Sequence, residues 1–489
     1  MTAHPANPNT PTPAPAPSAR DTAHTDPSPA PAPDAPARPA APSLMQRIKR
    51  GLGWTMSGYL FNQILRLVAN AILAHLLLRE HFGIVVTVSI FVQALKMFSD
   101  VGINAGIVQQ EGGDRRDYLD TAYTIKIIRG FLIWIVAAAI AYPVSVIYQE
   151  PQLMVVLPVI ALSAVIQGFQ ATSVAVLKRR IHLKALTLIN VAQMTVSSVV
   201  MIVFALIYPS VWALVAGTLT AALVYTVISY FIKADHRDRI RIDPVALRQI
   251  LSFGVWIFFS TALTFFAAQA DKLLLAGVLN FETMGIFGIA LALATFITKL
   301  MKQLCARVGF PALSELYRND FDRFRSRLRR FRKAVVIPSA ASCIAIAVLG
   351  PLLVDLIYPQ TFHAAGWIVV VLCINGIAAG VNSTYGNAFL AMGKTHLITI
   401  GVAVQFAAAV GLTLGGYHLA PSLGLSPAVG FIGAMALTEW AIHPVYAVMA
   451  RRAGIHDLKL DAMTLLPFGL VAGALLVLRD LPLFPGYGG

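Results

Sequence analysis

Long apolar segments follow one another along the chain from residue 51 to residue 478, and short polar loops separate them. Each segment is close to the ~20 residues that a helix needs to cross a bilayer. None shows the period-two alternation of a membrane β-barrel, so we predict helices. Twelve membrane spans and a shorter thirteenth are predicted at residues 51–78, 82–108, 120–147, 152–177, 185–207, 210–232, 251–279, 282–308, 335–357, 364–392, 397–417, 428–449 and 464–483.

The composition agrees with an all-α polytopic membrane protein. Hydrophobic residues make up 57% of the 489 residues and charged residues only 12%, whereas about a quarter of an ordinary soluble domain is charged. The three cysteines, Cys305, Cys343 and Cys373, have no ligand-like spacing. Neither a disulfide framework nor a metal site is therefore indicated, and no cofactor is expected.

The basic residues occupy every second loop. Their positions are residues 47–50, 115–116, 178–184, 233–248, 318–333, 394 and 451–459. By the positive-inside rule these loops and the N-terminus are predicted to be cytoplasmic. The alternation accounts for most of the net charge of +15. A nucleic-acid partner is therefore not indicated.

The first 43 residues differ from the rest of the chain. They hold 13 of the 28 prolines and no Leu, Ile, Val, Phe, Tyr or Trp. Such a segment cannot build a core, so we predict a disordered, Pro/Ala-rich cytoplasmic tail.

An internal repeat divides the remainder. A shift of 202 residues places Glu80 onto Glu282 and Gly83-Ile84 onto Gly285-Ile286. Because six spans separate the repeats, both halves enter the membrane from the same side, and an axis along the membrane normal relates them. We predict two pseudo-symmetric six-helix lobes: an N-lobe at 44–232, a linker at 233–250, a C-lobe at 251–450 and a C-terminal extension at 451–489.

The four spans paired by the repeat also carry polar side chains at mid-depth. An intramembrane charge costs at least ~2.5–3.5 kcal/mol and therefore faces a bundle interior or a watered cavity. The cations in these stripes outnumber the acids, so we predict a cationic cavity for an anionic cargo. The predicted cation set is Arg66, Lys96, Lys272, Lys299 and Lys302, and the other polar residues are Asn62, Asn70, Ser89, Gln93, Asp100, Asn104, Ser260, Thr264, Asp271, Thr295 and Thr298.

Internal ion pairs are the structural alternative for these charges, for example Arg66 or Lys96 with Asp100 or Asp271. Asp271 is the acid deepest in the C-lobe stripe, beside Lys272. We hypothesise that its protonation couples transport to an ion gradient, with a structural ion pair as the alternative.

Three other features have simpler interpretations. Lys126 and Arg129 lie in the cytoplasmic third of their span, where long side chains can reach the interface by snorkelling, with contact to the cargo as the alternative. Glu439 and His443 are four residues apart, a spacing at which the two side chains can bond each other, and a proton relay is the alternative. The apolar stripe of Phe321, Phe324, Leu328 and Phe331 among basic residues predicts an interfacial helix on the anionic cytoplasmic leaflet, with a solvated helix end as the alternative.

Several local sequences resemble a known family of membrane transporters. They are residues 77–83 (LLREHFG), 98–103 (FSDVGI), 177–183 (LKRRIHL), 269–275 (QADKLLL) and 388–393 (AFLAMG). They resemble the polysaccharide-transporter family, the Wzx-like flippases of the multidrug, oligosaccharidyl-lipid and polysaccharide exporter superfamily. The resemblance covers roughly residues 44–480. It implies two six-helix lobes around a cationic cavity walled by helices one, two, seven and eight, in a family that often has fourteen spans.

The resemblance also implies a function. Such proteins flip an undecaprenyl-pyrophosphate-linked oligosaccharide across the bacterial inner membrane by alternating access, for exopolysaccharide, capsule or O-antigen synthesis. The implied partners are this lipid-linked cargo, membrane lipids, and the polysaccharide polymerase or co-polymerase machinery.

Three other functions are alternatives to this interpretation. A membrane enzyme would need a catalytic constellation, and the chain has no Gly-rich phosphate loop, no HExxH motif and no nucleophile elbow. A cation-coupled drug antiporter would favour an acidic cavity. A lipid II flippase, which moves a related cargo, remains open.

Overall fold

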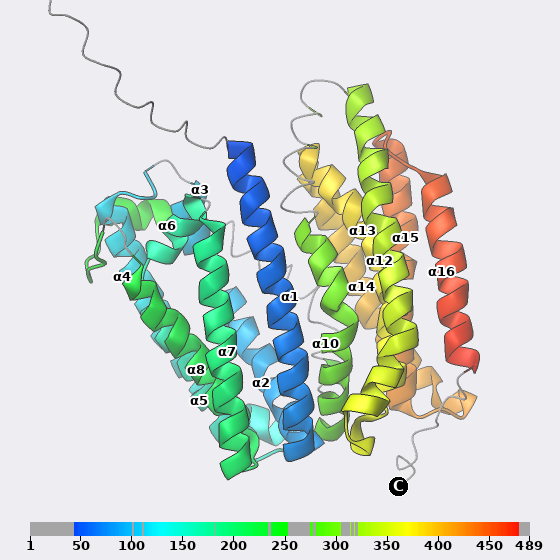
Figure 1. The fold of residues 1–489 in the computed structure, drawn as a ribbon, viewed down its shortest axis with the longest axis horizontal. Coiled ribbons are helices and arrows are strands. Elements are labelled where there is room, and N and C mark those ends of the chain that lie inside the picture. Colours follow the sequence, from blue (N-terminus) through cyan, green and yellow to red (C-terminus); the bar gives the residue numbers. More distant parts are fainter. Residues whose placement is uncertain are drawn as a thin grey trace, which may run out of the picture. The chain divides into compact units, whose positions relative to one another are not determined.

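A computed structural model describes residues 44–99, 102–109, 112–180, 182–232, 236–252, 274–275, 277, 280–304, 313, 317 and 321–478. The chain divides into two units, Met1–Arg47 and Ile48–Gly489, and the statements below concern the second. The predicted tail at 1–43 lies outside the described residues. Within the described ranges every regular element is a helix (Figure 1).

The helices fall into two groups in chain order. The first comprises α1 (Leu44–Leu76), α2 (Arg79–Phe98), α3 (Ile103–Gln109), α4 (Arg116–Ile147), α5 (Leu153–Gly168), α6 (Ser173–Arg179), α7 (Leu183–Ile207) and α8 (Val211–Phe231). The second comprises α10 (Phe281–Leu304), α12 (Phe321–Ile357), α13 (Ala365–Ala391), α14 (Thr395–Leu419), α15 (Pro427–Arg452) and α16 (Leu458–Leu478), with 3₁₀ turns at Gln360–Phe362 and Pro421–Leu423.

The prediction of an all-helical membrane protein is confirmed. Twelve of the thirteen predicted spans overlap a described helix, and the span at 251–279 lies almost entirely outside the described residues. Among the described helices, eight are long and apolar enough to cross a membrane, or nine if the bent pair α5 and α6 forms one span. The total of twelve or thirteen spans stays a prediction.

The structure moves three of the predicted boundaries. The second span ends as a helix at Phe98, and the short helix α3 follows Gly102, whose φ is 64°. The fourth span is broken between Gly168 and Ser173, with a bend of 68°. The ninth begins at Phe321, so the basic segment expected on the membrane surface is the first part of α12.

This helix corrects the prediction of an interfacial stripe. Phe324 and Leu328 are fully buried, and the Tyr317 and Phe324 rings meet edge to face with centroids 5.3 Å apart. These two residues of the stripe therefore pack inside the protein, whereas Phe321 is 42% exposed, and the neighbouring Arg325 and Arg327 are exposed too.

A buried ion pair also ties this helix to the C-terminal one. Arg332 is 0% exposed and lies 2.5 Å from an Asp461 carboxylate oxygen. Its Nε donates to Thr384 at 3.0 Å, and its guanidinium stacks 3.7 Å from the centre of the Tyr385 ring. The Tyr385 hydroxyl donates to the other Asp461 oxygen at 2.5 Å. The pair thus fixes α16 against α12 and α13.

A close contact between the two groups of helices joins α2 and α10. A Cβ on Gly83 would lie 1.8 Å from the Phe281 carbonyl oxygen, and one on Gly285 would lie 2.1 Å from that of Arg79. The 202-residue shift maps Gly83 onto Gly285 and Arg79 onto Phe281, so each half makes the same contact with the other. Glycine is required because any side chain would collide with backbone.

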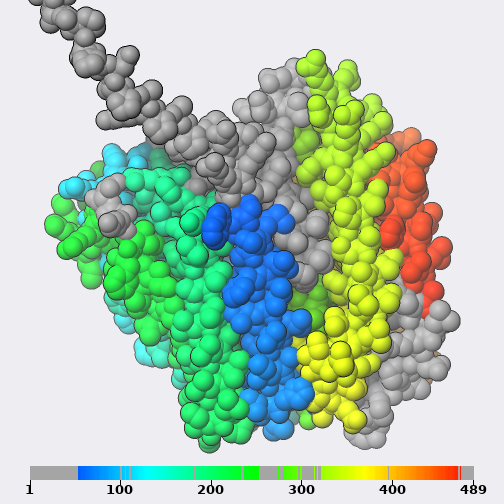
Figure 2. All heavy atoms as spheres, viewed as in Figure 1, coloured from blue at the N-terminus to red at the C-terminus, as the bar shows by residue number. Residues whose placement is uncertain are grey.

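Helix α1 lies at the surface of this assembly. Figure 2 shows it in blue between α7, in teal, and α12, in yellow. One face of α1 is apolar and exposed, including Phe61, Ile64 and Val68, which are 47–55% exposed. Exposed apolar side chains on a spanning helix are expected to face lipid.

We predict that Gly83→Ala and Gly285→Ala each destabilise the protein. The added methyl groups meet backbone carbonyls that cannot move aside, and overpacking of this kind typically costs about 1–3 kcal/mol. Apparent thermal unfolding of the detergent-purified protein measures the effect. Gly411→Ala in α14, where a Cβ would meet nothing within 4 Å, is the control. Unchanged melting of both variants would contradict the tight contact.

Candidate functional site

Two cavities meet at α1. One, of about 350 Å³, lies between α1 and α7, and the other, of about 270 Å³, lies between α1 and helices α10 and α12. Gln63 and Arg66 line both, Asn62 lines the first and Asn70 the second. The predicted polar face of the first span therefore borders cavities on both sides.

Arg66 has no ion-pair partner within the described part of the chain. The buried Tyr358 lines the same cavity, just after α12. Burial raises the pKa of Tyr358 to about 12, and the Arg66 charge opposes that rise. The Asn62 side-chain oxygen is buried and has no hydrogen-bond partner among the described residues. The wall formed by α1 thus presents a cation and an unused acceptor.

A second pair of cavities lies within the N-terminal group of helices. Each has a volume of about 240 Å³, and the two share Asn104, Lys126, Gln167 and Gln170 as lining residues. The cations that line them come from α2, α4 and α6. They are Lys96, Lys126, Arg129 and Lys178.

Hydrogen bonds fix three of these cations. Lys96 Nζ donates to the Gln167 side-chain oxygen at 3.2 Å, and Lys126 Nζ donates to the Gln170 carbonyl oxygen at 2.6 Å. Arg129 Nε donates to the Ser99 hydroxyl at 3.0 Å. No Asp or Glu is among the described residues that line either cavity. The arrangement is a cationic pocket with amide side chains.

The pocket is built where the fourth span breaks. Gly130 and Gly168 allow α4 and α5 to touch, since a Cβ on Gly130 would lie 2.6 Å from the Ala164 carbonyl oxygen, and one on Gly168 would lie 2.9 Å from that of Lys126. The break frees the Gln170 carbonyl to accept from Lys126. The backbone N–H of Ala171 in turn donates to the Ser229 hydroxyl at 3.0 Å.

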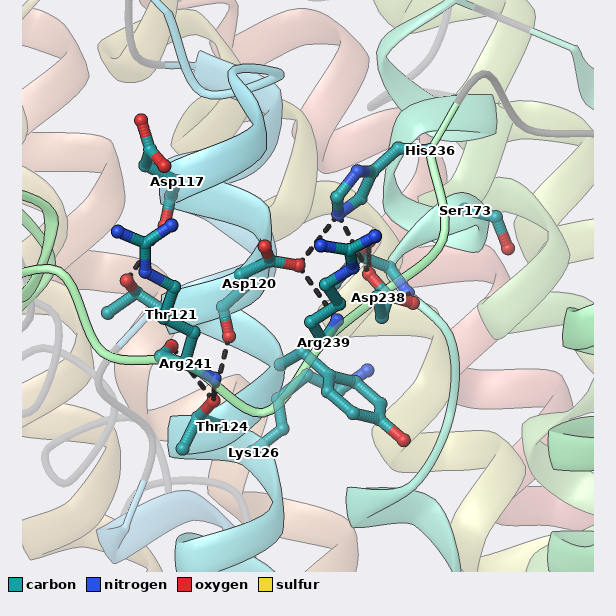
Figure 3. Close-up of polar contacts among 12 residues, drawn as sticks. Asp117, Asp120, Thr121, Thr124, Lys126, Ser173, His236, Asp238, Arg239 and Arg241 are labelled. Atoms are coloured by element: carbon teal, nitrogen blue, oxygen red, sulfur yellow. Dashed lines mark hydrogen bonds and ion pairs between the residues drawn. The ribbon is translucent and has the colours of Figure 1, made fainter.

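The predicted linker lies along α4, beside this break (Figure 3). Backbone N–H groups of alternate linker residues donate to α4 side chains: Arg239 to Asp120 at 2.8 Å, Arg241 to Thr124 at 3.0 Å and Asp243 to Thr121 at 2.9 Å. Farther on, Ala246 and Ile250 are buried against α3 and α4 residues. The described part of the linker, residues 236–250, is therefore docked on the N-terminal helices.

Three possible metal ligands lie where the linker contacts α4. Atoms of Asp120, His236 and Asp238 lie within 4.8 Å of one another. They already bond the protein, because His236 Nε2 lies 2.8 Å from an Asp120 oxygen, and Asp238 accepts from the Thr172 N–H at 2.8 Å. The Asp238 carboxylate also attracts the Lys126 ammonium group electrostatically. The cluster joins the linker, α4 and the helix break.

The structure places the predicted site residues in different surroundings. Asn62, Arg66 and Asn70 line the α1 cavities, and Lys96 and Asn104 line the N-terminal pocket. Gln93 and Lys299 are exposed, and the Thr295 hydroxyl donates to the Leu291 carbonyl within α10. Asp100, Ser260, Thr264, Asp271, Lys272 and the Lys302 side chain lie outside the described residues.

Two sequence interpretations are wrong. Lys126 and Arg129 do not simply snorkel, because both line the N-terminal pocket. Glu439 and His443 do not bond each other. The Glu439 carboxylate accepts from the Asn382 amide at 2.8 Å, and His443 Nδ1 lies 3.0 Å from the Asn382 side-chain oxygen. One sequence pattern could have predicted the pocket: Lys126 and Arg129 are three residues apart and so share one helix face.

The chain has the fold of the multidrug, oligosaccharidyl-lipid and polysaccharide exporter superfamily. The chain superposes on lipid II flippase MurJ in an inward closed conformation with a TM-score of 0.66 and 12% identity, covering 87% of this chain and 92% of that one. An inward-facing multidrug resistance transporter of the superfamily gives 0.63 and 14%, covering 80% and 94%.

Sequence comparison defines the family. The chain belongs to the family described as polysaccharide biosynthesis protein, whose profile matches residues 72–366. It is 21% identical to the teichuronic acid biosynthesis protein TuaB of Bacillus subtilis (strain 168), over 73% of this chain and 74% of that protein. It is 23% identical to the amylovoran biosynthesis protein AmsL of Erwinia amylovora, over 60% and 75%.

We predict that Asp120→Ala loosens the linker from α4. The change removes the acceptor of the Arg239 N–H and the partner of His236, and an unsatisfied buried polar group costs about 1–3 kcal/mol. A lower melting temperature in detergent and faster proteolysis within residues 236–243 are expected. Asp117→Ala, one turn away on the exposed face of α4, is the control. Equal behaviour of the two variants would contradict the docking role.

Proposed function

We propose that this protein is a transporter that moves an undecaprenyl-pyrophosphate-linked oligosaccharide across the bacterial inner membrane by alternating access. In this proposal the N-terminus is cytoplasmic, and the glycan serves exopolysaccharide, capsule or O-antigen synthesis. Membership of the polysaccharide biosynthesis family supports the substrate class. The names of the two relatives, a teichuronic acid and an amylovoran biosynthesis protein, support it further.

The observation that carries the proposal is the cationic pocket at the helix break. Lys96, Lys126, Arg129 and Lys178 line it, and no acid is among the described lining residues. Ammonium and guanidinium groups hold phosphate oxygens by charge-assisted hydrogen bonds. The amides of Gln167 and neighbouring residues can bond sugar hydroxyls, so the pocket suits an anionic head group that carries a glycan.

The cavities also suggest a route between the two groups of helices. Gln193 lines both the N-terminal pocket and the α1–α7 cavity, and Gln63 and Arg66 join that cavity to the one beside α12. The last of these is walled mainly by apolar side chains such as Leu349 and Leu353. A route that is cationic at one end and apolar at the other suits an amphiphile.

The C-terminal half of the predicted site remains a proposal. Lys272, Lys299 and Lys302 would add cations from the seventh and eighth spans, and Asp271 would couple transport to an ion gradient. The polysaccharide polymerase or co-polymerase machinery is proposed as a partner, because it would use the oligosaccharide that this protein transports.

Transport of lipid II is the second candidate, favoured by the fold shared with MurJ. The same cationic pocket would serve it, because lipid II is a related cargo with an anionic head group. A drug antiporter is disfavoured, since a cavity lined by cations repels a cationic drug. Catalysis is disfavoured because the described cavities present cations and amides without a nucleophile and base in contact.

We predict that Lys126→Gln weakens binding of undecaprenyl pyrophosphate to the purified protein by roughly ten- to hundredfold, the equivalent of a charged hydrogen bond worth about 1.5–3 kcal/mol. Polysaccharide export in the native host should fall at equal membrane abundance. Lys333→Gln removes an exposed cation from α12 and is the control. Unchanged binding by Lys126→Gln and by Lys96→Gln would overturn the assignment of the pocket.

We predict that Arg66→Ala sharply reduces export while the protein accumulates normally, because neutralising an intramembrane charge relieves a desolvation cost. Arg66→Lys should restore export only in part, since an ammonium lacks the planar fork that binds two phosphate oxygens. Export and membrane abundance are measured together. An internal ion pair predicts the opposite pattern: low abundance of Arg66→Ala, restored by a second neutralisation at Asp100 or Asp271.

A further inference from the structure

A groove separates the ends of α14 and α15 that lie next to the basic loops. Its volume is about 570 Å³. Lys394 precedes α14, and Arg452 ends α15, so both cations lie at the same end of the groove. The lining residues are Lys394, His396, Leu397, Ile400, Pro444, Val445, Val448, Met449, Arg452 and Ala453.

Close contacts deeper in the pair hold α14 to α15. A Cβ on Gly416 would lie 2.4 Å from the Gly430 carbonyl oxygen, and one on Gly401 would lie 2.5 Å from the Tyr446 hydroxyl. Pro444 lines the groove from inside α15, where its ring has no backbone N–H to donate to the preceding turn.

The charges of the groove have one sign. No acid lines it, and neither Lys394 nor Arg452 has an ion-pair partner within the described residues. Both belong to loops that the positive-inside rule assigns to the cytoplasm. The end of the groove therefore offers two cations at the level of the cytoplasmic head groups.

The walls of the groove have the opposite character. Ile400 is 48% exposed and Val448 is 52% exposed, although both lie within helices that cross the membrane. Helix α14 is covered chiefly by α15, and only 17% of its apolar window is buried. The apolar walls are thus open to the lipid phase, one to two turns from the cations.

We propose that this groove binds an anionic phospholipid of the cytoplasmic leaflet. Lys394 and Arg452 hold the head-group phosphate, and an acyl chain lies along Ile400, Pro444 and Val448. The groove shares no lining residue with the four cavities assigned to cargo. The bound lipid would hold α14 to α15 where the two helices diverge, and its binding does not depend on the identity of the cargo.

Native mass spectrometry of the purified full-length protein tests this assignment. The probes are phosphatidylglycerol and phosphatidylcholine with the same acyl chains. Retention of phosphatidylglycerol over phosphatidylcholine is expected. The double variant Lys394→Gln/Arg452→Gln should retain phosphatidylglycerol about thirtyfold less well, since each surface cation contributes roughly 1 kcal/mol to binding of anionic lipid.

Two further variants keep the test decisive. Arg451→Gln/Lys459→Gln removes two exposed cations next to the groove that do not line it, and it should retain the lipid like the parent. Val448→Trp fills the groove but keeps both cations, and it should lose the lipid.

Four results would overturn the proposal. Equal losses in both charge variants would show diffuse surface attraction. Equal retention of phosphatidylglycerol and phosphatidylcholine would show apolar adhesion alone. Unchanged retention by Val448→Trp, or displacement by millimolar inorganic phosphate, would show that the cations bind a free anion without an acyl chain in the groove.

Discussion

The contact between α2 and α10 is the constraint on which the two-part structure depends. Gly83 and Gly285 let the two backbones touch. Gly83 lies against Phe281 and Gly285 against Arg79, and the 202-residue shift makes these two contacts equivalent. Around this point Phe82 meets Phe362 edge to face at 5.8 Å, and Arg79 pairs with Glu282 at 3.2 Å. Packing at one end of these helices leaves α1 free to border cavities on both sides.

The cationic pocket depends on a second constraint, the break between α5 and α6. A continuous helix would have used the Gln170 carbonyl internally, whereas the break leaves it to accept from Lys126. The linker secures the same region, because Asp238 accepts from the Thr172 N–H, and Asp120 accepts from Arg239. The chain that joins the two halves is thus anchored beside the pocket proposed to bind the cargo.

These arrangements give the polar groups of the membrane interior distinct tasks. Arg332 and Asp461 form a buried ion pair that fixes α16, and Asn382 bonds both Glu439 and His443. Lys126 donates to the Gln170 carbonyl oxygen and faces a cavity. Satisfied networks stabilise helix packing, while cations in acid-free cavities can accept a ligand.

The sequence by itself determined the helices, the family and the repeat, because apolar length, loop charge and self-similarity are local properties of the chain. It also determined that Arg66, Asn62 and Asn70 share one face. Only the tertiary structure decided what each face meets. Snorkelling and cavity-lining cations look alike in sequence, so Lys126 and Arg129 were misjudged, as was the buried stripe of Phe324 and Leu328. Those outcomes depend on partners from distant segments, such as the α5–α6 break and Tyr317, whose positions no local pattern encodes.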